Sequence, residues 1–211
     1  MSKLIFKPQD FAAQVDVSRE TMHRLEVFAA LLAKWQPKVN LIGASTLPDL
    51  WHRHMLDSAQ IFPHLPAGQV LDAGAGAGFP GMVLAIMARE DEERGPVHLV
   101  ESDGRKCAFL AEVAKETEAK AIVHNDRVEE LAPFPVTSIV ARALAPLDRL
   151  LPLVENFVGP ETHCFFLKGR GANDELTEAR KDWTFHVERI PSMTDAEGVL
   201  LHLTGVRRGG S

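Results

Sequence analysis

Two kinds of hydrophobic pattern divide the chain near Gly68. Before it, apolar residues recur at the three- and four-residue spacing of amphipathic helices, from Ser18 to Trp35 and from about Leu47 to Phe62. A serine at the start can cap the first helix, and Pro37 is expected to end it. We therefore predict an N-terminal helical region over residues 1–67.

Residues 68–208 instead show short apolar runs separated by helix-like segments, the pattern of parallel βαβ units. The runs are Val70–Asp72, Val97–Val100, Ala121–Val123, Ser138–Ala141 and Cys164–Leu167. Two last runs, Phe185–Glu188 and Val199–Val206, predict an antiparallel hairpin. The expected fold class is α/β: a doubly wound, mostly parallel, Rossmann-like sheet with a C-terminal antiparallel hairpin, preceded by the helical region and followed by a tail over 209–211.

The most informative segment is the glycine-rich turn Val70-Leu71-Asp72-Ala73-Gly74-Ala75-Gly76-Ala77-Gly78-Phe79-Pro80-Gly81. Glycine adopts positive φ and lets a ligand approach the backbone closely. The turn follows a buried strand and opens a helix, which is where open α/β sheets bind ligands. The segment therefore predicts a ligand site, with a tight turn that binds nothing as the alternative.

Asp72 favours S-adenosylmethionine (AdoMet) over a dinucleotide as that ligand. The G-x-G-x-x-G match from Gly76 to Gly81 is shared with dinucleotide sites and does not discriminate. A carboxylate at the end of the first strand, however, suits the amino group of a cationic ligand and opposes a pyrophosphate. Glu101 ends the second strand, where it can accept hydrogen bonds from the ribose of either cofactor. The candidate cofactor ligands from this pattern are Asp72, Gly74, Gly76, Gly78 and Glu101.

The composition is that of an ordinary globular chain, with 211 residues, 45% hydrophobic and 25% charged. No apolar run reaches the roughly 18 residues of a membrane helix, and the first residues lack a signal-peptide core, so a cytoplasmic protein without membrane contact is expected. Cys107 and Cys164 are too few for a disulfide framework and are expected to be buried thiols. The net charge of −6 means that an RNA substrate would need a local basic patch.

A series of short motifs runs in order along the chain from Lys34 to the final strand. They are Lys34-Trp35, Asn40-Leu41, Arg53-His54-x-x-Asp57-Ser58, Phe79-Pro80-Gly81, Glu101-Ser102, Lys106, Phe109-Leu110, Arg127-Val128-Glu129-Glu130, Ala141-Arg142-Ala143 and Leu167-Lys168-Gly169. Together they resemble the RsmG (GidB) family of bacterial 16S ribosomal RNA guanine-N7 methyltransferases. Several motifs in the right order are more specific than any one of them.

The resemblance implies a class I methyltransferase sheet after a helical region, with AdoMet as cofactor. It also implies 16S ribosomal RNA, free or within a small-subunit particle, as the partner, and a monomer is expected. Carried over position by position, the AdoMet contacts fall at Gly74, Phe79, Val128, Glu129 and Arg142. The departures are mild, such as Ala75 where Ser or Thr is common.

Guanine N7 bears a lone pair and no proton, so its methylation needs no general base and depends on positioning and electrostatics. Arg142 and Lys168, the candidate catalytic residues, each end a predicted strand at the ligand edge. We expect Arg142 to hydrogen-bond the cofactor or guanine O6. We expect Lys168 to contact an RNA phosphate from a flexible basic loop, with a solvated surface cation as the alternative.

His52 and His54 invite a metal interpretation, but residues two apart on a helix point to different faces. No metal site is therefore expected. His54, Asp57 and Ser58 do share a face, and we expect them to form a polar anchor between the helical region and the sheet.

Two other functions share part of this evidence. A nicotinamide-dependent oxidoreductase would have the same glycine turn and Glu101, but it requires a substrate domain and a proton-transfer residue, for which the sequence offers no candidate. A non-enzymatic RNA-binding module is opposed by the net charge of −6. The cofactor that raises the melting temperature, and RNA binding without any cofactor, would discriminate among the three.

Overall fold

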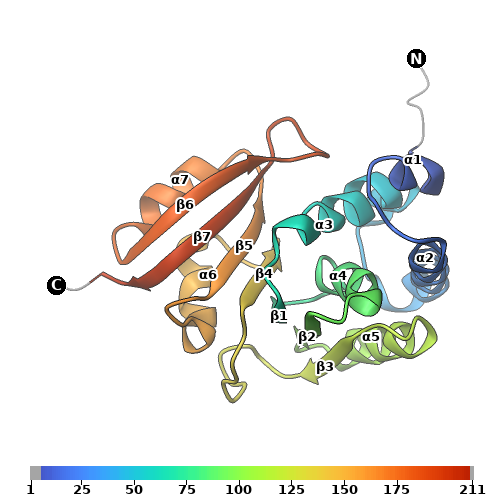
Figure 1. Cartoon of the computed structure of the whole chain (residues 1–211), viewed down its shortest axis with the longest axis horizontal. Coiled ribbons are helices and arrows are strands. Elements are labelled where there is room, and N and C mark those ends of the chain that lie inside the picture. Colours follow the sequence, from blue (N-terminus) through green and yellow to red (C-terminus); the bar gives the residue numbers. More distant parts are fainter. Residues whose placement is uncertain (1–5, 210–211) are drawn as a thin grey trace.

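A seven-stranded sheet forms the centre of the computed structural model, which describes residues 6–209 (Figure 1). Parts of two expected segments, the start of the chain (1–5) and the tail (210–211), lie outside the described residues. The strands are β1 (Gly68–Ala73), β2 (Arg94–Glu101), β3 (Ala121–Asn125), β4 (Ser138–Arg142), β5 (His163–Lys168), β6 (Trp183–Pro191) and β7 (Val199–Arg208).

The strand order is β3-β2-β1-β4-β5-β7-β6. Neighbouring strands among β1 to β5 pair in parallel, whereas β7 is antiparallel to both β5 and β6. The predicted fold class, a mostly parallel sheet that ends in an antiparallel hairpin, is confirmed. The strand predictions were correct in place, and each end was exact or up to three residues short.

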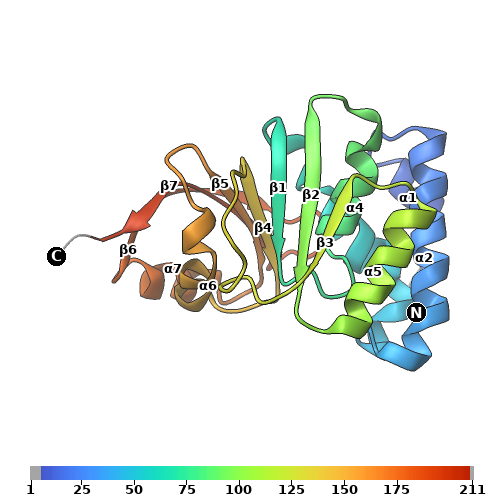
Figure 2. The same ribbon diagram turned by 90° about the horizontal axis from the view of Figure 1, so that it is seen from below.

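Helices cover the sheet on both faces (Figures 1 and 2). One face carries α4 (Gly81–Met87), which continues into η4 (Ala88–Glu90), and α5 (Gly104–Glu116), with α1 (Pro8–Ala12) and α2 (Arg19–Val39) outside them. The other face carries α6 (Leu147–Val154), η5 (Glu155–Phe157) and α7 (Ala172–Ala179). No helix within residues 6–209 has the length and apolar character needed to cross a membrane.

Alternate residues of the central strands fill two separate cores. Val70 and Leu99 belong to the core on the α4 side, and Leu71 and Val100 belong to the core on the α6 side. Because both faces of these strands are buried, their sequences are continuous apolar runs rather than alternating ones.

The prediction that Pro37 ends the first helix is wrong, because α2 continues to Val39. Proline removes one backbone hydrogen bond, but the last turn is held from outside. The amide side chain of Gln36 both donates to the Ile42 carbonyl (2.6 Å) and accepts from the Ile42 amide (3.0 Å). Asn40 then ends the helix in the left-handed conformation, with φ 51°.

The single helix predicted from Leu47 to Phe62 is also wrong. This stretch consists of η1 (Ala44–Asp49), the π-helical turn η2 (Trp51–Leu56), α3 (Asp57–Ala59) and η3 (Phe62–His64). Such π turns widen a helix locally and often occur at functional sites. Here the turn carries His54, a residue of the candidate site described below.

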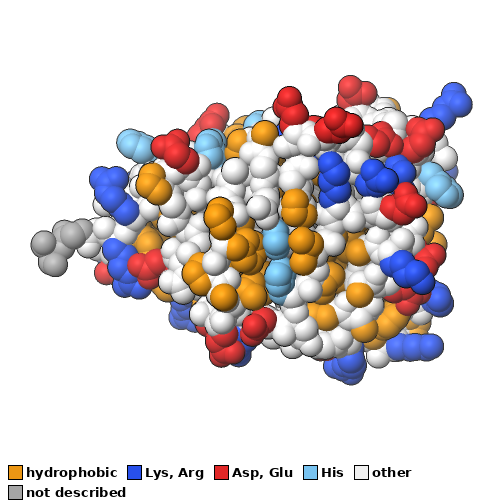
Figure 3. Space-filling view, turned by 60° about the horizontal axis from the view of Figure 1, so that its bottom comes forward, with side chains coloured by type: hydrophobic (Ala, Val, Ile, Leu, Met, Phe, Trp, Pro, Cys, Tyr) orange, Lys and Arg blue, Asp and Glu red, His pale blue; other side chains and the backbone are white. Residues whose placement is uncertain are grey.

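The connection from β3 to β4 contains no helix, so a part of the sheet near β3 is covered only by side chains. The ring of Phe134 packs on His98 and His124, with centroid distances of 4.2 and 5.7 Å. Figure 3 shows this side of the molecule, where histidine and hydrophobic side chains gather between charged borders.

Candidate active site

A cavity of about 1010 Å³ opens where β1, β4 and β5 end. The turn after β1, the N-terminal segment that includes η1 and η2, and the loop between β6 and β7 (residues 192–198) line it, together with residues 142–146 after β4, residues 167–169 at the end of β5, and Glu175 of α7. Of the predicted site residues, Gly74, Gly76, Phe79, Arg142 and Lys168 line the cavity. It lies at the carboxyl edge of a parallel sheet, where such folds bind ligands.

Gly76 presents bare backbone to this cavity. Its φ is +58°, and a Cβ built on it would meet only the Gly74 carbonyl, at 3.9 Å. At Gly78 (φ +91°), by contrast, a Cβ would lie 2.8 Å from the Cβ of Met82. The first glycine therefore leaves space for a ligand, whereas the second allows the turn to pack on α4.

Asp72 lies beneath the turn and does not line the cavity. Its Oδ2 accepts a hydrogen bond from the Gly81 amide (2.8 Å), while its Oδ1 is buried without a partner among the described residues. Burial raises the pKa of the Asp72 carboxyl to about 7, against the lowering effects of the Gly81 hydrogen bond and of Arg142. The geometry gives Asp72 a role in joining β1 to α4, where the sequence suggested direct contact with the cofactor.

Glu101 reaches the turn from the end of β2. Its Oε2 accepts from the Gly76 amide (2.9 Å) and its Oε1 from the Asp103 amide (2.8 Å), and Lys106 Nζ lies 3.9 Å away. The carboxylate is thus placed beside the ligand-accessible glycine, where it could also accept from hydroxyl groups.

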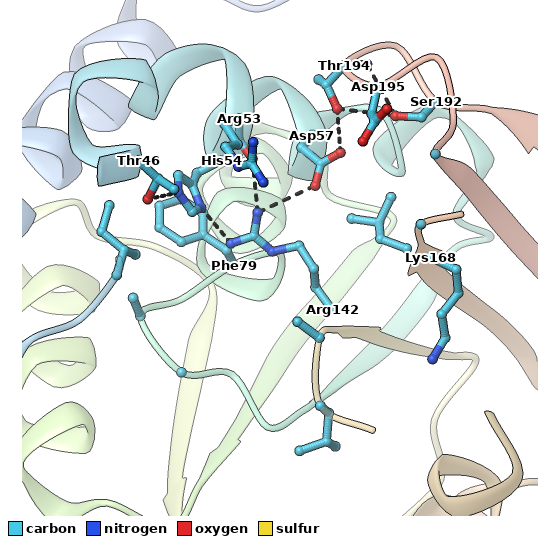
Figure 4. Close-up of a pocket in the computed structure, with 18 of the residues that line it drawn as sticks. Thr46, Arg53, His54, Asp57, Phe79, Arg142, Lys168, Ser192, Thr194 and Asp195 are labelled. Atoms are coloured by element: carbon cyan, nitrogen blue, oxygen red, sulfur yellow. Dashed lines mark hydrogen bonds and ion pairs between the residues drawn. The ribbon is translucent and has the colours of Figure 1, made fainter. Parts of the chain in front are cut away.

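Arg142, at the end of β4, joins the sheet to the N-terminal region (Figure 4). Its Nη1 donates to the Arg53 carbonyl (3.1 Å) and to Asp57 Oδ2 (3.4 Å). Its guanidinium also lies over the ring of Phe79, 5.1 Å from the centroid. Burial lowers the pKa of Arg142 and the carboxylate of Asp57 opposes this change, so the group stays charged.

His54 is held as a neutral acceptor for Arg142. Because a guanidinium only donates, the 2.7 Å contact from Arg142 Nη2 requires a lone pair on His54 Nδ1. The ring proton is then on Nε2 and is donated to Thr46 Oγ1 (2.9 Å), which itself donates to the Gly43 carbonyl (2.8 Å). Burial, with the charges of Arg142 and Arg53, lowers the pKa of His54 to about 3.

Lys168, at the end of β5, is buried and paired. Its Nζ lies 2.8 Å from Glu175 Oε2 and donates to the Ala145 carbonyl (2.7 Å), and its side chain is 8% exposed. Glu175 also accepts from the Leu147 amide (2.9 Å). The lysine and its partner thus hold the segment that connects β4 to α6, where the sequence suggested a flexible basic loop.

Val128 and Glu129 do not line this cavity. Val128 is buried in the core on the α6 side, and Glu129 is exposed and paired with Arg127 at 3.5 Å.

Phe79 stacks on Phe28 and contacts His54, with ring centroids 5.1 and 5.0 Å apart. Among the described residues, no group of three His, Cys, Asp or Glu side chains could hold a metal ion.

Sequence reasoning missed several residues that complete the site, namely Thr46, Glu175, Ser192, Thr194 and Asp195. They are ordinary polar residues of turns and loops. The one useful signal was the shared helical face of His54 and Asp57, which contact Arg142 and so anchor the helical region to the sheet as predicted. Ser58, the third residue of the predicted anchor, instead donates its hydroxyl to the His54 carbonyl (2.7 Å).

Solved structures share the fold. A protein of Listeria monocytogenes described as a class I S-adenosylmethionine-dependent methyltransferase superimposes with a TM-score of 0.60 at 14% identity, covering 91% of this chain and 69% of that one. The fibrillarin pre-rRNA processing protein of Methanococcus jannaschii gives a TM-score of 0.55 at 14% identity, covering 74% and 76%. The architecture is that of the class I AdoMet-dependent methyltransferases.

Sequence comparison is more specific. The family model of GidB, described as rRNA small subunit methyltransferase G, matches residues 21–203. The ribosomal RNA small subunit methyltransferase G of Paramagnetospirillum magneticum is 52% identical, covering 96% of this chain and 97% of that protein. The protein of that name from Rhodospirillum centenum is 51% identical, covering 97% and 94%. The chain belongs to the GidB family and is an AdoMet-dependent methyltransferase.

Proposed function

We propose that this enzyme methylates N7 of a guanine in 16S ribosomal RNA. The names of its relatives support ribosomal RNA as the substrate. One observation carries the rest: a guanidinium, Arg142, is fixed by Asp57 and His54 in the wall of the cavity, which is lined by Gly76 of the turn after β1 and by Thr194 of the β6–β7 loop.

The half of the cavity at Gly76 fits AdoMet, because the space over this glycine is open and the Glu101 carboxylate lies beside it. In this proposal the Gly74–Gly76 backbone holds the amino-acid part of the cofactor, and Glu101 accepts from the ribose hydroxyls. When bound, AdoMet supplies an electrophilic methyl group. Arg142 and Phe79 then separate the cofactor from the half of the cavity near Thr194, which receives the base.

No general base is required, and three titratable side chains that line the cavity are already engaged. Asp57 accepts from Arg142, Glu175 is paired with Lys168, and the lone pair of His54 Nδ1 is used by Arg142. Arg142 would orient the purine, in keeping with a reaction that depends on positioning. A carbonyl such as guanine O6 is a suitable acceptor for its remaining N–H groups.

Incubating the enzyme with labelled AdoMet and total RNA from a strain that lacks it would test the proposal. We expect label in small-subunit RNA at a single guanine, and alkaline chemistry diagnostic of N7-methylguanine at that position. Label on an exocyclic amine, on a ribose or only on protein would contradict it. Comparing free RNA with small-subunit particles in the same assay identifies the form of the substrate.

The absence of a general base predicts a flat pH dependence. The single-turnover rate should stay constant from about pH 6.5 to 8.5, because His54 remains neutral throughout this range. A rise of one log unit per pH unit that disappears on mutating a single residue would contradict the mechanism. Asp72, whose pKa is raised to about 7, is the residue to test first in that event.

A further inference from the structure

The β6–β7 loop is fastened to the N-terminal region across the rim of the cavity. The Met193 amide donates to Gln60 Oε1 (2.9 Å), and the Thr194 hydroxyl donates to Asp57 Oδ1 (2.7 Å). More than 130 positions separate the partners in each bond. Figure 4 shows Thr194 directed at the carboxylate of Asp57 on the side away from Arg142.

Asp57 divides its two oxygens between the loop and Arg142. Oδ1 accepts from Thr194 and from Gln60 Nε2 (2.9 Å), whereas Oδ2 faces Arg142 Nη1 at 3.4 Å. The side chains of Asp57 and Arg142 are only 16% and 18% exposed. Water therefore replaces a lost partner poorly at this position.

The hydrogen-bond directions in the loop are determined. The single hydroxyl hydrogen of Thr194 is used toward Asp57, because a carboxylate can only accept. In the 3.2 Å contact between Ser192 Oγ and Thr194 Oγ1, serine must then be the donor. Ser192 Oγ accepts in turn from the Thr194 amide (3.2 Å), so the loop itself orients the hydroxyl.

We propose that Thr194 is a positioning residue for methyl transfer, acting through Asp57 on Arg142. The inference rests on the role of Arg142 in the proposed function. The Asp57–Arg142 contact is long, so a small rotation of the carboxylate would lose it, and Thr194, together with Gln60, limits that rotation. Displacing a group by about 1 Å at a reacting centre can cost up to a hundredfold in rate. Substrate binding to the β6–β7 loop would alter the position of Arg142 through the same contacts of Thr194 with Asp57 and of Asp57 with Arg142.

The test compares Thr194→Val, which removes the hydroxyl, with Thr194→Ser, which keeps it. We expect the valine variant to reduce single-turnover methyl transfer at saturating RNA about tenfold and the serine variant to stay within about twofold of wild type, with AdoMet affinity unchanged in both. Thr184→Val is the matched control, because Thr184 lies on the same hairpin in β6, exposed and without a side-chain hydrogen bond in the described residues.

A double-mutant cycle separates positioning from general destabilisation. Thr194→Val should have little further effect in an Asp57→Asn background, because the connection to Arg142 is already weakened there. Wild-type rates for Thr194→Val, failure of serine to restore the rate, or multiplicative effects in the cycle would each overturn the proposal.

A readout without RNA distinguishes failure of this inference from failure of the proposed function. In the NMR spectrum of the enzyme with ¹⁵N-labelled arginine, Thr194→Val should speed exchange of the Arg142 guanidinium protons, and Thr184→Val should not. If the Arg142 signal changes in Thr194→Val but wild type transfers no methyl group to ribosomal RNA, the proposed function is wrong and the connection from Thr194 to Arg142 still holds. An unchanged signal would remove the connection whatever the activity.

Discussion

Arg142 and Lys168 end adjacent parallel strands and line the same cavity, yet they are neutralised from opposite faces of the sheet. Arg142 is paired with Asp57 of the N-terminal region, whereas Lys168 is paired with Glu175 of α7. Arginine has five donors in a planar fork, and Arg142 keeps some of them available after binding Asp57, His54 and the Arg53 carbonyl. The ammonium group of Lys168 forms an ion pair with Glu175 and donates to the Ala145 carbonyl. Similar positions at strand ends thus lead to different tasks, because the packing partners differ.

The largest expected effect is that of Arg142→Ala. Removing the guanidinium should slow single-turnover methyl transfer at saturating RNA by about a hundredfold or more, since positioning at the reacting centre is lost. AdoMet binding, measured separately by calorimetry, should also weaken. Arg142→Lys keeps the charge without the fork and should recover little. Wild-type transfer and cofactor affinity in Arg142→Ala would exclude a site over β4.

Gly76→Val tests the cofactor half of the cavity, where binding uses backbone rather than charge. AdoMet at a hundredfold excess over its dissociation constant should stabilise wild type by about 2.7 kcal/mol, and the variant should lose this gain. Gly205→Val is a control for backbone strain, because Gly205 has a φ of +60° in β7, with its nearest contact to an added Cβ at 3.5 Å. If the control loses the AdoMet shift equally, strain rather than occupied ligand space explains the result.

Lys168→Met sharpens the contrast between the two cations. It should lower the free energy of unfolding by about 2 kcal/mol, because Glu175 loses its partner in a partly buried setting. Lys168→Met combined with Glu175→Gln should recover most of this loss in denaturant titrations, since the amide oxygen can still accept from Leu147. A different result would favour a phosphate contact by Lys168: unchanged stability, together with a slope of log binding constant against log salt concentration that is shallower by about one.

The effect of Asp72→Asn on the free energy of unfolding is expected to be smallest at acidic pH. Burial raises the folded-state pKa of Asp72 to about 7, above its unfolded value, so the folded state binds the extra proton between about pH 4 and 7. This group alone then lowers the stability of wild type as pH rises, by up to about 1.4 kcal/mol per unit. Asparagine has no such proton to lose. The variant should therefore gain stability relative to wild type from pH 4 to 7.

The quantity to measure is the difference in unfolding free energy between Asp72→Asn and wild type, because the titration of His54 acts in the opposite direction in both proteins. Its folded-state pKa of about 3 lies below its unfolded value, so it makes wild type more stable as pH rises toward 6.5. Cofactor binding should persist in Asp72→Asn, since the buried side chain does not line the cavity. Loss of binding would restore the direct role in AdoMet binding suggested by the sequence.

The elements around β1 were predictable because their signals are local. A continuous apolar run, an aspartate and closely spaced glycines predicted the strand, the turn and the ligand space over Gly76. The path of α2 past Pro37 was not predictable, because a side chain six residues from its partner, Gln36 to Ile42, compensates for the proline. The division of residues 44–64 into short helices also escaped the apolar periodicity, which is similar for α and π turns.

By itself the sequence determined the succession of strands along the chain, the cofactor class and the family, since hydrophobic period, turn chemistry and motif order are properties of neighbouring residues. Only the tertiary structure decided what each charged side chain does. It buried Asp72 beneath the turn, paired Lys168 with Glu175, and brought Thr194 to Asp57 beside Arg142. These pairings join segments that are far apart in the chain, and their geometry depends on how the sheet, the helical region and the terminal hairpin pack around one cavity.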